Sequence, residues 1–503
     1  MMIVEWFMPF IRTYAPRQRA WVAVLFWTAL ALWIVSLATI GGMGIIDDEG
    51  SYIPSAQAIG AFVRGEIDAA AMLEPVVRYG WFMPGVPLLF TPIFLFGDPG
   101  NFVVRLYAGF LVLALWLWMQ REVNRALGPV YVIFLLAFPT LMLNWQFFAK
   151  TALGDVPAGL VMTIGFCRLF TITRTVLAGR DIRFSDIAVF ELVLVLMVYL
   201  RGSTWILVAA IHIYLVAIAL FARNRATLFA VLPRIGAGFL VFAALLAPWS
   251  LVVTSYFGAP VLTTTTATLA FGVTFGDVRK LCFGPCPEGN LWFEAGKFSR
   301  EISAARGISE LEVQREMARS ALGTFNIPRY LARVRANFRN FLLKPNWYNR
   351  FFIDRVTKVG GKATAFLADA LNFLSRIGLY AIYFPALCAL FIGNLCIATR
   401  RESEQIFSLM IKMFTLCILI QPFFHISHSR YWPTFAPLMS LSAAAIFTWI
   451  WTRLGRSPSA ETATPPAVAE IHDEASPGIR SLVIVQALYV AVILVIAAVV
   501  FSA

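Results

Sequence analysis

Residues 20–44 decide the fold class, because they read AWVAVLFWTALALWIVSLATIGGMG and contain no charged side chain. An α-helix crosses the hydrocarbon core of a bilayer with about 20 apolar residues, since every backbone polar group has to be bonded within the segment. The stretch is long and lacks a convincing small-residue cleavage site. We therefore expect an uncleaved membrane anchor here.

The composition of the whole chain agrees with a membrane protein. Hydrophobic residues make up 59% of the 503 residues and charged residues 14%, against about a quarter in soluble domains. Six cysteines are too few for a secreted disulfide scaffold, and the apolar content excludes disorder and collagen. The 41 Lys and Arg exceed the 28 Asp and Glu by 13. We attribute this excess to membrane topology and expect no nucleic-acid partner, because the basic residues lie mostly in short loops.

The apolar runs predict an all-α polytopic membrane protein with about eleven transmembrane helices. The expected spans are 20–44, 102–119, 129–146, 156–173, 187–200, 203–221, 231–256, 376–397, 406–423, 432–451 and 480–501. The pair 187–200 and 203–221 is the weakest, because its first member is short. Arg201-Gly202-Ser203 between them is either a tight turn or a kink.

Arginine clusters in the short loops predict the orientation of these spans. They precede the first span and follow the second, fourth, sixth, eighth and tenth, as Arg121 and Arg125 do after the second. All of them fall on one side when the N-terminus is cytoplasmic, which is the positive-inside pattern. The sequence thus predicts a multi-pass protein of the inner (cytoplasmic) membrane.

Longer connections divide the chain. They are a first external loop (45–101), a large external segment (257–375) and a Pro-rich, flexible cytoplasmic linker (454–479). The expected units are an N-terminal transmembrane module (1–256), the external segment, C-terminal transmembrane helices (376–453), the linker and a last helix (480–503). We find no internal repeat, which weighs against a secondary transporter.

The external segment has features of its own. Cys282 and Cys286 are expected outside the cell, where disulfides persist, so we expect them to be paired. A charged helix is expected over 299–321. The basic amphipathic stretch 329–342 is expected on the membrane surface, where it docks the segment or gathers anionic lipid.

An acidic cluster, Asp47-Asp48-Glu49, follows the first span and is followed by Tyr52. Three adjacent carboxylates repel one another, and such a cluster tends to raise a pKa or to recruit a cation. The alternative is a solvated helix N-terminus, where the dipole favours acids. Interfacial helices are expected over 53–63 and 86–96. Asp155, after the third span, is expected on the same face as Asp48.

Five short motifs occur in a fixed order along the chain. They are Asp48-Glu49 with Tyr52, Pro84-Gly85-Val86-Pro87-Leu88-Leu89, Arg105-Leu106, Asp155-Val156-Pro157 and Arg430-Tyr431-Trp432-Pro433. This set resembles the GT-C superfamily of membrane glycosyltransferases, in the branch of protein O-mannosyltransferases and lipid A aminoarabinose transferases. The resemblance covers roughly the first 220 residues and the 420–440 region, and the 257–375 segment matches nothing that we recognise.

The resemblance implies a GT-C-like helix bundle that moves a sugar from a polyprenyl-phosphate carrier to an envelope acceptor, with inversion at the anomeric carbon. The acceptor would be lipid A or core sugar, cell-wall glycan or protein. Inverting transfer needs a carboxylate to take the proton of the attacking hydroxyl, and Asp48 matches that position. Glu49 would orient the acceptor or share a cation, and Asp155 matches a position near the acceptor or a metal. A divalent cation, Mg²⁺ or Mn²⁺, held by these three carboxylates is a candidate cofactor.

The phosphate leaving group needs cationic or hydrogen-bonding partners. The candidates on the expected external face are Tyr52, Lys150, Arg201, His425, His428, Arg430 and Tyr431. Arg430 is the best of them, because the family places a basic or polar residue before its Tyr. Lys150 and Arg201 would otherwise be snorkelling side chains, and the two His an ordinary interfacial pair.

Two other functions stay open. One is a glycan ligase that uses a diphosphate-linked carrier. The other is a transporter or flippase of lipid-linked sugars, which predicts ionisable residues buried in mid-span. The expected spans hold few of these, and Glu191 and Lys412 are expected near cytoplasmic ends.

Overall fold

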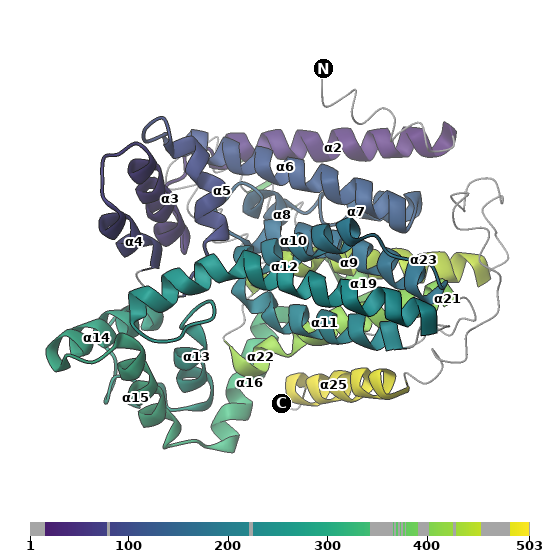
Figure 1. Ribbon diagram of the computed structural model, residues 1–503. Coiled ribbons are helices and arrows are strands. Elements are labelled where there is room, and N and C mark those ends of the chain that lie inside the picture. Colours follow the sequence, from purple (N-terminus) through teal and green to yellow (C-terminus); the bar gives the residue numbers. More distant parts are fainter. Residues whose placement is uncertain are drawn as a thin grey trace.

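The computed structural model describes residues 16–77, 81–220, 225–342, 379–390, 402–425, 429–453 and 483–501, with isolated residues between 366 and 377. Within these residues the chain is α-helical, with short 3-10 and π segments and no β-strand. Seven of the described helical segments are long and apolar enough to cross a membrane. The protein is therefore a multi-pass, all-α membrane protein (Figure 1).

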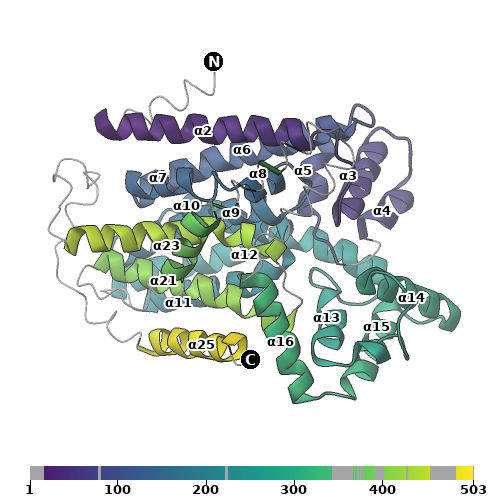
Figure 2. The same cartoon turned by 180° about the vertical axis from the view of Figure 1, so that it is seen from behind.

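The long helices run side by side in one bundle (Figures 1 and 2). They are α2 (Pro16–Ile40), α6 (Asn101–Ala126), α9 (Asp155–Leu177), α11 (Trp205–Leu220), α12 (Arg225–Phe257), α21 (Glu402–Leu419) and α23 (Trp432–Arg453). A last apolar helix, α25 (Val483–Phe501), lies at one edge. Helix α9 is the central one, because nearly all of its side chains are buried and it packs against α6, α10 (Phe184–Leu200), α21 and α23.

The structure corrects one predicted span and resolves another. The helix expected over 129–146 is wrong as a continuous span, since α7 (Pro129–Ala137) and α8 (Leu143–Phe148) are separate. The break falls at Pro139, which lacks a backbone N–H and disfavours helix at the residue before it. The weakest expected pair is two helices, α10 and α11, joined by the 3-10 turn η1 (Gly202–Thr204).

The other C-terminal expectations are met only in part. The span expected over 376–397 is described as η3 (Leu379–Tyr383) and α19 (Phe384–Cys388), and its remainder lies largely outside the described residues. The 454–479 linker lies outside them as well. The total of about eleven transmembrane helices stays a prediction.

Three short helices gather at one end of the bundle, at the left in Figure 1. They are α3 (Glu49–Val63), α4 (Ala69–Val77) and α5 (Gly85–Phe94). Helices were expected over 53–63 and 86–96, and α3 and α5 cover these stretches. We call this end of the bundle the α3–α5 end.

The segment after α12 lies at the same end (Figure 1). It contains α13 (Thr266–Phe275), η2 (Val278–Lys280), α14 (Leu291–Arg306), α15 (Glu310–Leu322) and α16 (Ile327–Leu342). The helices from α13 to α15 enclose a small core around Leu269, Val313 and Met317, whereas Val334 and Phe338 of α16 pack with Ile496 and Val500 of α25. A disulfide joins Cys282 to Cys286, as the sequence led us to expect.

The charged stretch that was expected to be helical over 299–321 is helical, but it is divided between α14 and α15. Gly307 takes a left-handed conformation with φ of 64° and ends α14. On α16 the arginines bind protein groups: Arg329 pairs with Asp277 at 3.1 Å, and Arg333 donates to the Gly276 carbonyl at 3.2 Å. Part of the basic face therefore holds the segment together.

Candidate functional site

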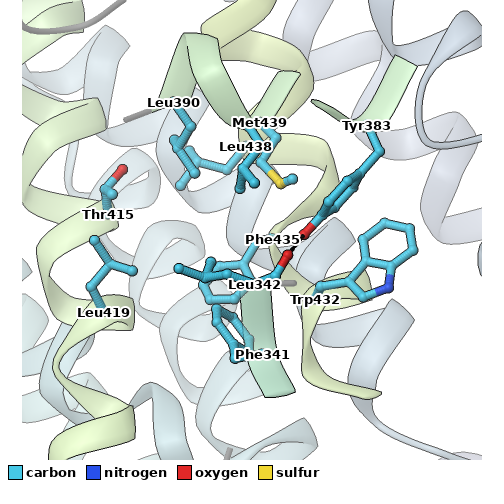
Figure 3. Close-up of a pocket in the computed structure, with 11 residues that line it drawn as sticks. Phe341, Leu342, Tyr383, Leu390, Thr415, Leu419, Trp432, Phe435, Leu438 and Met439 are labelled. Carbon is cyan, nitrogen blue, oxygen red and sulfur yellow. Dashed lines mark hydrogen bonds between the residues drawn. The ribbon is translucent and has the colours of Figure 1, made fainter. Parts of the chain in front are cut away.

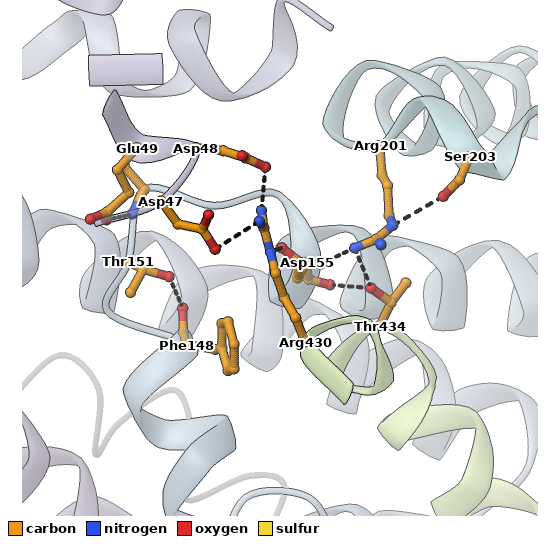
Figure 4. Close-up of polar contacts among 11 residues, drawn as sticks. Asp47, Asp48, Glu49, Phe148, Thr151, Asp155, Arg201, Ser203, Arg430 and Thr434 are labelled. Carbon is orange, nitrogen blue, oxygen red and sulfur yellow. Dashed lines mark hydrogen bonds and ion pairs between the residues drawn. The ribbon is translucent and has the colours of Figure 1, made fainter. Parts of the chain in front are cut away.

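The acidic cluster divides into two groups that face opposite ways. Asp47 has φ of 52°, in the left-handed region that Asp tolerates better than most residues. This turn precedes α3 and directs Asp47 and Asp48 toward Arg430, whereas Glu49 points away from it (Figure 4). Neighbouring carboxylates in the sequence thus occupy different environments.

Arg430 is the centre of the site. Its Nη1 donates to Asp47 Oδ2 at 3.0 Å and its Nη2 to Asp48 Oδ2 at 2.5 Å. Its Nε lies 3.6 Å from Asp155 Oδ2. The Arg430 side chain is only 10% exposed, while those of Asp47 and Asp48 are 30% and 26% exposed. One guanidinium therefore joins the turn before α3, the start of α9 and the turn before α23.

Arg201 approaches Asp155 from the other side (Figure 4). Its Nη1 donates to Asp155 Oδ1, and to Thr434 Oγ1 at 3.1 Å. Thr434 Oγ1 in turn donates to the Asp155 carbonyl oxygen at 3.0 Å. The Arg201 guanidinium lies 4.3 Å from the centre of the Tyr431 ring, a cation–π contact. Burial lowers the pKa of Arg201 to about 10, so the side chain stays cationic at neutral pH.

Two glycines allow the close packing that brings Arg201 to Asp155. A Cβ atom at Gly85 would lie 2.5 Å from the Tyr199 carbonyl oxygen, and one at Gly154 would overlap the Leu200 carbonyl oxygen. Only residues without a side chain let α5 and the start of α9 reach the last turn of α10. Arg201 follows that turn directly, and Asp155 follows Gly154.

Two tyrosines complete the cluster. Tyr52 lies on α3 one turn after Asp48. Its ring packs edge-on against the Phe82 ring, with 4.9 Å between the ring centres. Burial and then the Asp48 charge raise the pKa of Tyr52, and burial raises the pKa of Tyr431. Both phenols therefore keep their protons at neutral pH. The structure brings together Asp48, Tyr52, Asp155, Arg201, Arg430 and Tyr431 of the residues singled out from the sequence.

Glu49 does not belong to this cluster. It is completely buried, and both of its oxygens accept from Arg105, with Nη2 to Oε2 at 2.7 Å. The backbone N–H groups of Ile46 and Ala152 add bonds at 2.9 and 2.6 Å. Glu49 therefore joins α3, α6 and the turn before α9, and no contact in the described structure places it beside Asp48 or Asp155.

Two other expected phosphate ligands lie elsewhere. Lys150 is buried, donates to the Gln146 carbonyl at 3.1 Å and lies 5.0 Å from the centre of the Trp33 ring. Burial lowers the pKa of Lys150 well below its usual value. The His425 ring stacks on the Trp292 ring of α14, with 5.3 Å between the ring centres, so His425 contacts the segment after α12. His428 lies outside the described residues.

The expected divalent-cation site does not fit the residues present. Within the described ranges no three His, Cys, Asp or Glu side chains form a group that could hold a metal. Glu49 faces Arg105, and Asp48 and Asp155 face guanidinium groups. An arrangement of two arginines suits an anion better than a cation.

A pocket opens beside Arg201. Its polar wall is formed by Arg201, Ser203, Thr204, Gln421, Tyr431 and Thr434, and its apolar wall by Met162, Leu207, Cys417, Ile418 and Phe435. The pocket therefore joins the Arg201 guanidinium to apolar side chains of α11 and α21. A second pocket lies around Trp432, Tyr383 and Phe341 and is almost entirely apolar (Figure 3).

Sequence reasoning missed two participants. Thr434 follows Arg430 by one helical turn, and this spacing is the signal that could have shown it. Asp47 was part of the acidic cluster, but only its left-handed turn aims it at Arg430.

The fold and the site define a class: a multi-pass helical membrane protein with an arginine–aspartate cluster at one end of its bundle. Neither the known protein-family models nor the curated protein sequences contain a match to this chain.

Proposed function

We propose that the protein is an inverting glycosyltransferase. It transfers a sugar from a polyprenyl-phosphate carrier to a hydroxyl group of an envelope acceptor, at the external face of the membrane. The observation that carries this proposal is Arg430, which bridges Asp48 and Asp155 next to a second arginine, Arg201. The α3–α5 end of the bundle is then the external one.

In this reaction Asp48 accepts the proton of the attacking hydroxyl. The hydroxyl oxygen forms the new bond to the anomeric carbon, and the bond from that carbon to the phosphate oxygen breaks. The phosphate leaves with the electron pair. Asp48 suits the role of base because its side chain is 26% exposed and an acceptor can reach it.

The arginines suit the leaving phosphate. Guanidinium groups bind phosphate oxygens through paired N–H donors and remain charged at every relevant pH. Arg201 and Arg430 now bind carboxylates, so an incoming phosphate would exchange with Asp155 and Asp47 as their partner. Thr434 and Ser203 hold the plane of Arg201 during that exchange.

The pocket beside Arg201 suits the prenyl chain. Leu207, Cys417 and Ile418 line it together with Arg201, and these three side chains belong to two long apolar helices. A carrier lipid could place its phosphate at Arg201 and its first isoprene units against these side chains. The buried apolar walls would supply about 25 cal/mol per Å² of carrier surface removed from water.

The test is sugar transfer by the purified protein in liposomes. Donors with a monophosphate and with a diphosphate linkage are offered side by side, with Asp48→Asn as the inactive variant. Asp98→Asn is the matched control, because Asp98 is an exposed acid of the same 45–101 loop.

Transfer from the monophosphate donor that is lost in Asp48→Asn supports the proposal. Use of the diphosphate donor alone would favour a ligase, and carrier movement without sugar transfer would favour a flippase. Mass analysis of envelope lipids and glycans with and without the gene identifies the sugar and the acceptor.

A further inference from the structure

Two titratable side chains meet inside the bundle, away from the Arg430 cluster. Glu191 is completely buried and lies close to the middle of α10, so its expected position near the end of a span is wrong. His212 lies close to the middle of α11. An ionisable group within a membrane bundle is costly unless it is paired, and it is often functional.

The hydrogen bonds of His212 fix where its protons are. Its Nδ1 lies 2.9 Å from the Val208 carbonyl oxygen, which only accepts, so Nδ1 carries a hydrogen. Its Nε2 lies 3.1 Å from Glu191 Oε2. A neutral ring protonated at Nδ1 offers only a lone pair at Nε2, and an ionised carboxylate also offers only lone pairs. The contact therefore needs one proton between the two atoms.

The surroundings of the pair are largely apolar. The rings of Phe239 and Phe242 on α12 pack edge-on against His212 at 5.4 and 5.2 Å. Glu191 Oε1 is buried and has no hydrogen-bond partner in the described structure. It faces Gly238, where a Cβ atom would lie 3.2 Å from it. An unprotonated carboxylate with one bare oxygen is expensive in such a place.

Several other ionisable groups on the packed helices have partners of their own, and Lys412 Nζ of α21 lies 5.8 Å from the centre of the Tyr489 ring. Arg168 of α9 pairs with Glu122 at 2.7 Å, and Arg234 of α12 pairs with Asp181. Tyr214 of α11 accepts from Thr173 at 3.3 Å. The proton between Glu191 and His212 is thus not replaced by a neighbouring cation.

We propose that Glu191 and His212 form an intramembrane proton-binding site, which holds one proton at neutral pH and locks α10 to α11. These two helices flank Arg201, which lies in the turn between them. Loss of the proton would leave two acceptors facing each other and would loosen that pair of helices. The inference is independent of the proposed glycosyl transfer, because it rests only on the contacts of Glu191 and His212.

Spectroscopy of the full chain in lipid bilayers tests the site directly. The chain has only four histidines, so ¹⁵N-histidine labelling and a difference spectrum against His212→Gln isolate the ring. Infrared difference spectra against Glu191→Gln isolate the carboxyl group. At about pH 7.5, above the ordinary pKa of both groups, we expect one proton on the pair.

A protonated ring with an ionised carboxylate and a neutral ring with a carboxylic acid both support the proposal. A neutral ring with an ionised carboxylate, or two protons on the pair, overturns it. If one variant fails to fold, the wild-type ring signal together with a carboxyl band assigned by ¹³C labelling still distinguishes these cases.

Stability against pH gives a second readout. Well above the ordinary histidine pKa of about 6.5, an unfolded chain binds almost no proton at these two groups, whereas the native pair holds one. Wild-type stability therefore falls as the pH rises. Glu191→Gln keeps a donor to Nε2 without titrating, and we expect it to flatten this slope. Glu122→Gln is the matched control, because Glu122 pairs with the permanently charged Arg168. An unchanged slope in Glu191→Gln would overturn the inference.

Discussion

The Arg105–Glu49 pair and the Arg430 group both lie at the α3–α5 end, and they differ in burial and in the number of carboxylates that share one arginine. Arg105 and Glu49 are 1% and 0% exposed, and two backbone N–H groups complete the carboxylate. Arg430 instead pairs with Asp47, Asp48 and Asp155, and the side chains of Asp47 and Asp48 are partly exposed. A completely buried pair whose carboxylate is fully hydrogen-bonded holds segments together, whereas a shared arginine with partly exposed partners can exchange them.

The largest effect on stability should come from breaking the buried Arg105–Glu49 pair. Arg105→Leu leaves the Glu49 charge buried without its partner, which costs about 3–5 kcal/mol of stability. Thermal unfolding in detergent measures it, with Arg430→Leu as the comparison. We expect the smaller loss for Arg430→Leu, because Asp47 and Asp48 reach water and Asp155 keeps Arg201. Equal losses would remove the distinction between the two groups.

The next largest effect is a loss of activity without a loss of stability. Asp48→Asn should lower the rate of sugar transfer by about 10²–10⁴-fold, the contribution of a positioned general base. Its melting temperature should stay near that of the wild type, because Arg430 keeps Asp47 and Asp155. A variant that transfers sugar at the wild-type rate would show that another group takes the proton.

A smaller effect is expected at the second arginine. Arg201→Lys keeps the charge but cannot contact Asp155, Thr434 and Ser203 together, as the planar fork does. Loss of one charge-assisted hydrogen bond, about 1.5–3 kcal/mol, should raise KM for the donor by about 10- to 100-fold. Arg279→Lys is the control, because the Arg279 side chain is 77% exposed. Equal KM values in Arg201→Lys and Arg279→Lys would show that Arg201 does not bind the donor phosphate.

The smallest effect is expected at Lys150, a buried cation without a carboxylate. Its pKa is lowered by burial, so the native state binds fewer protons than the unfolded chain below the ordinary lysine pKa of about 10.4. Wild-type stability should therefore gain from this group as the pH rises toward that value. Lys150→Met should remove this gain and leave sugar transfer unchanged. A loss of sugar transfer in Lys150→Met would show that Lys150 takes part in the reaction.

The convergence of distant segments could be predicted only in outline. Ordered motifs on one expected face were enough to associate Asp48, Asp155 and Arg430, since helix ends at the same end of a bundle lie near one another. The break at Pro139 was missed, although a proline ends a helix for a local reason. The apolar content of the 129–146 stretch outweighs that signal.

By itself the sequence determined that the chain is a bundle of apolar helices, because hydrocarbon admits no unpaired backbone over about 20 residues. Only the tertiary structure decided that Asp48 faces Arg430 while Glu49 faces Arg105, and that Glu191 meets His212 in mid-helix. Side-chain direction at a turn follows backbone torsions, and partners across helices follow packing. Neither side-chain direction at a turn nor pairing across helices can be predicted from the spacing of the apolar residues.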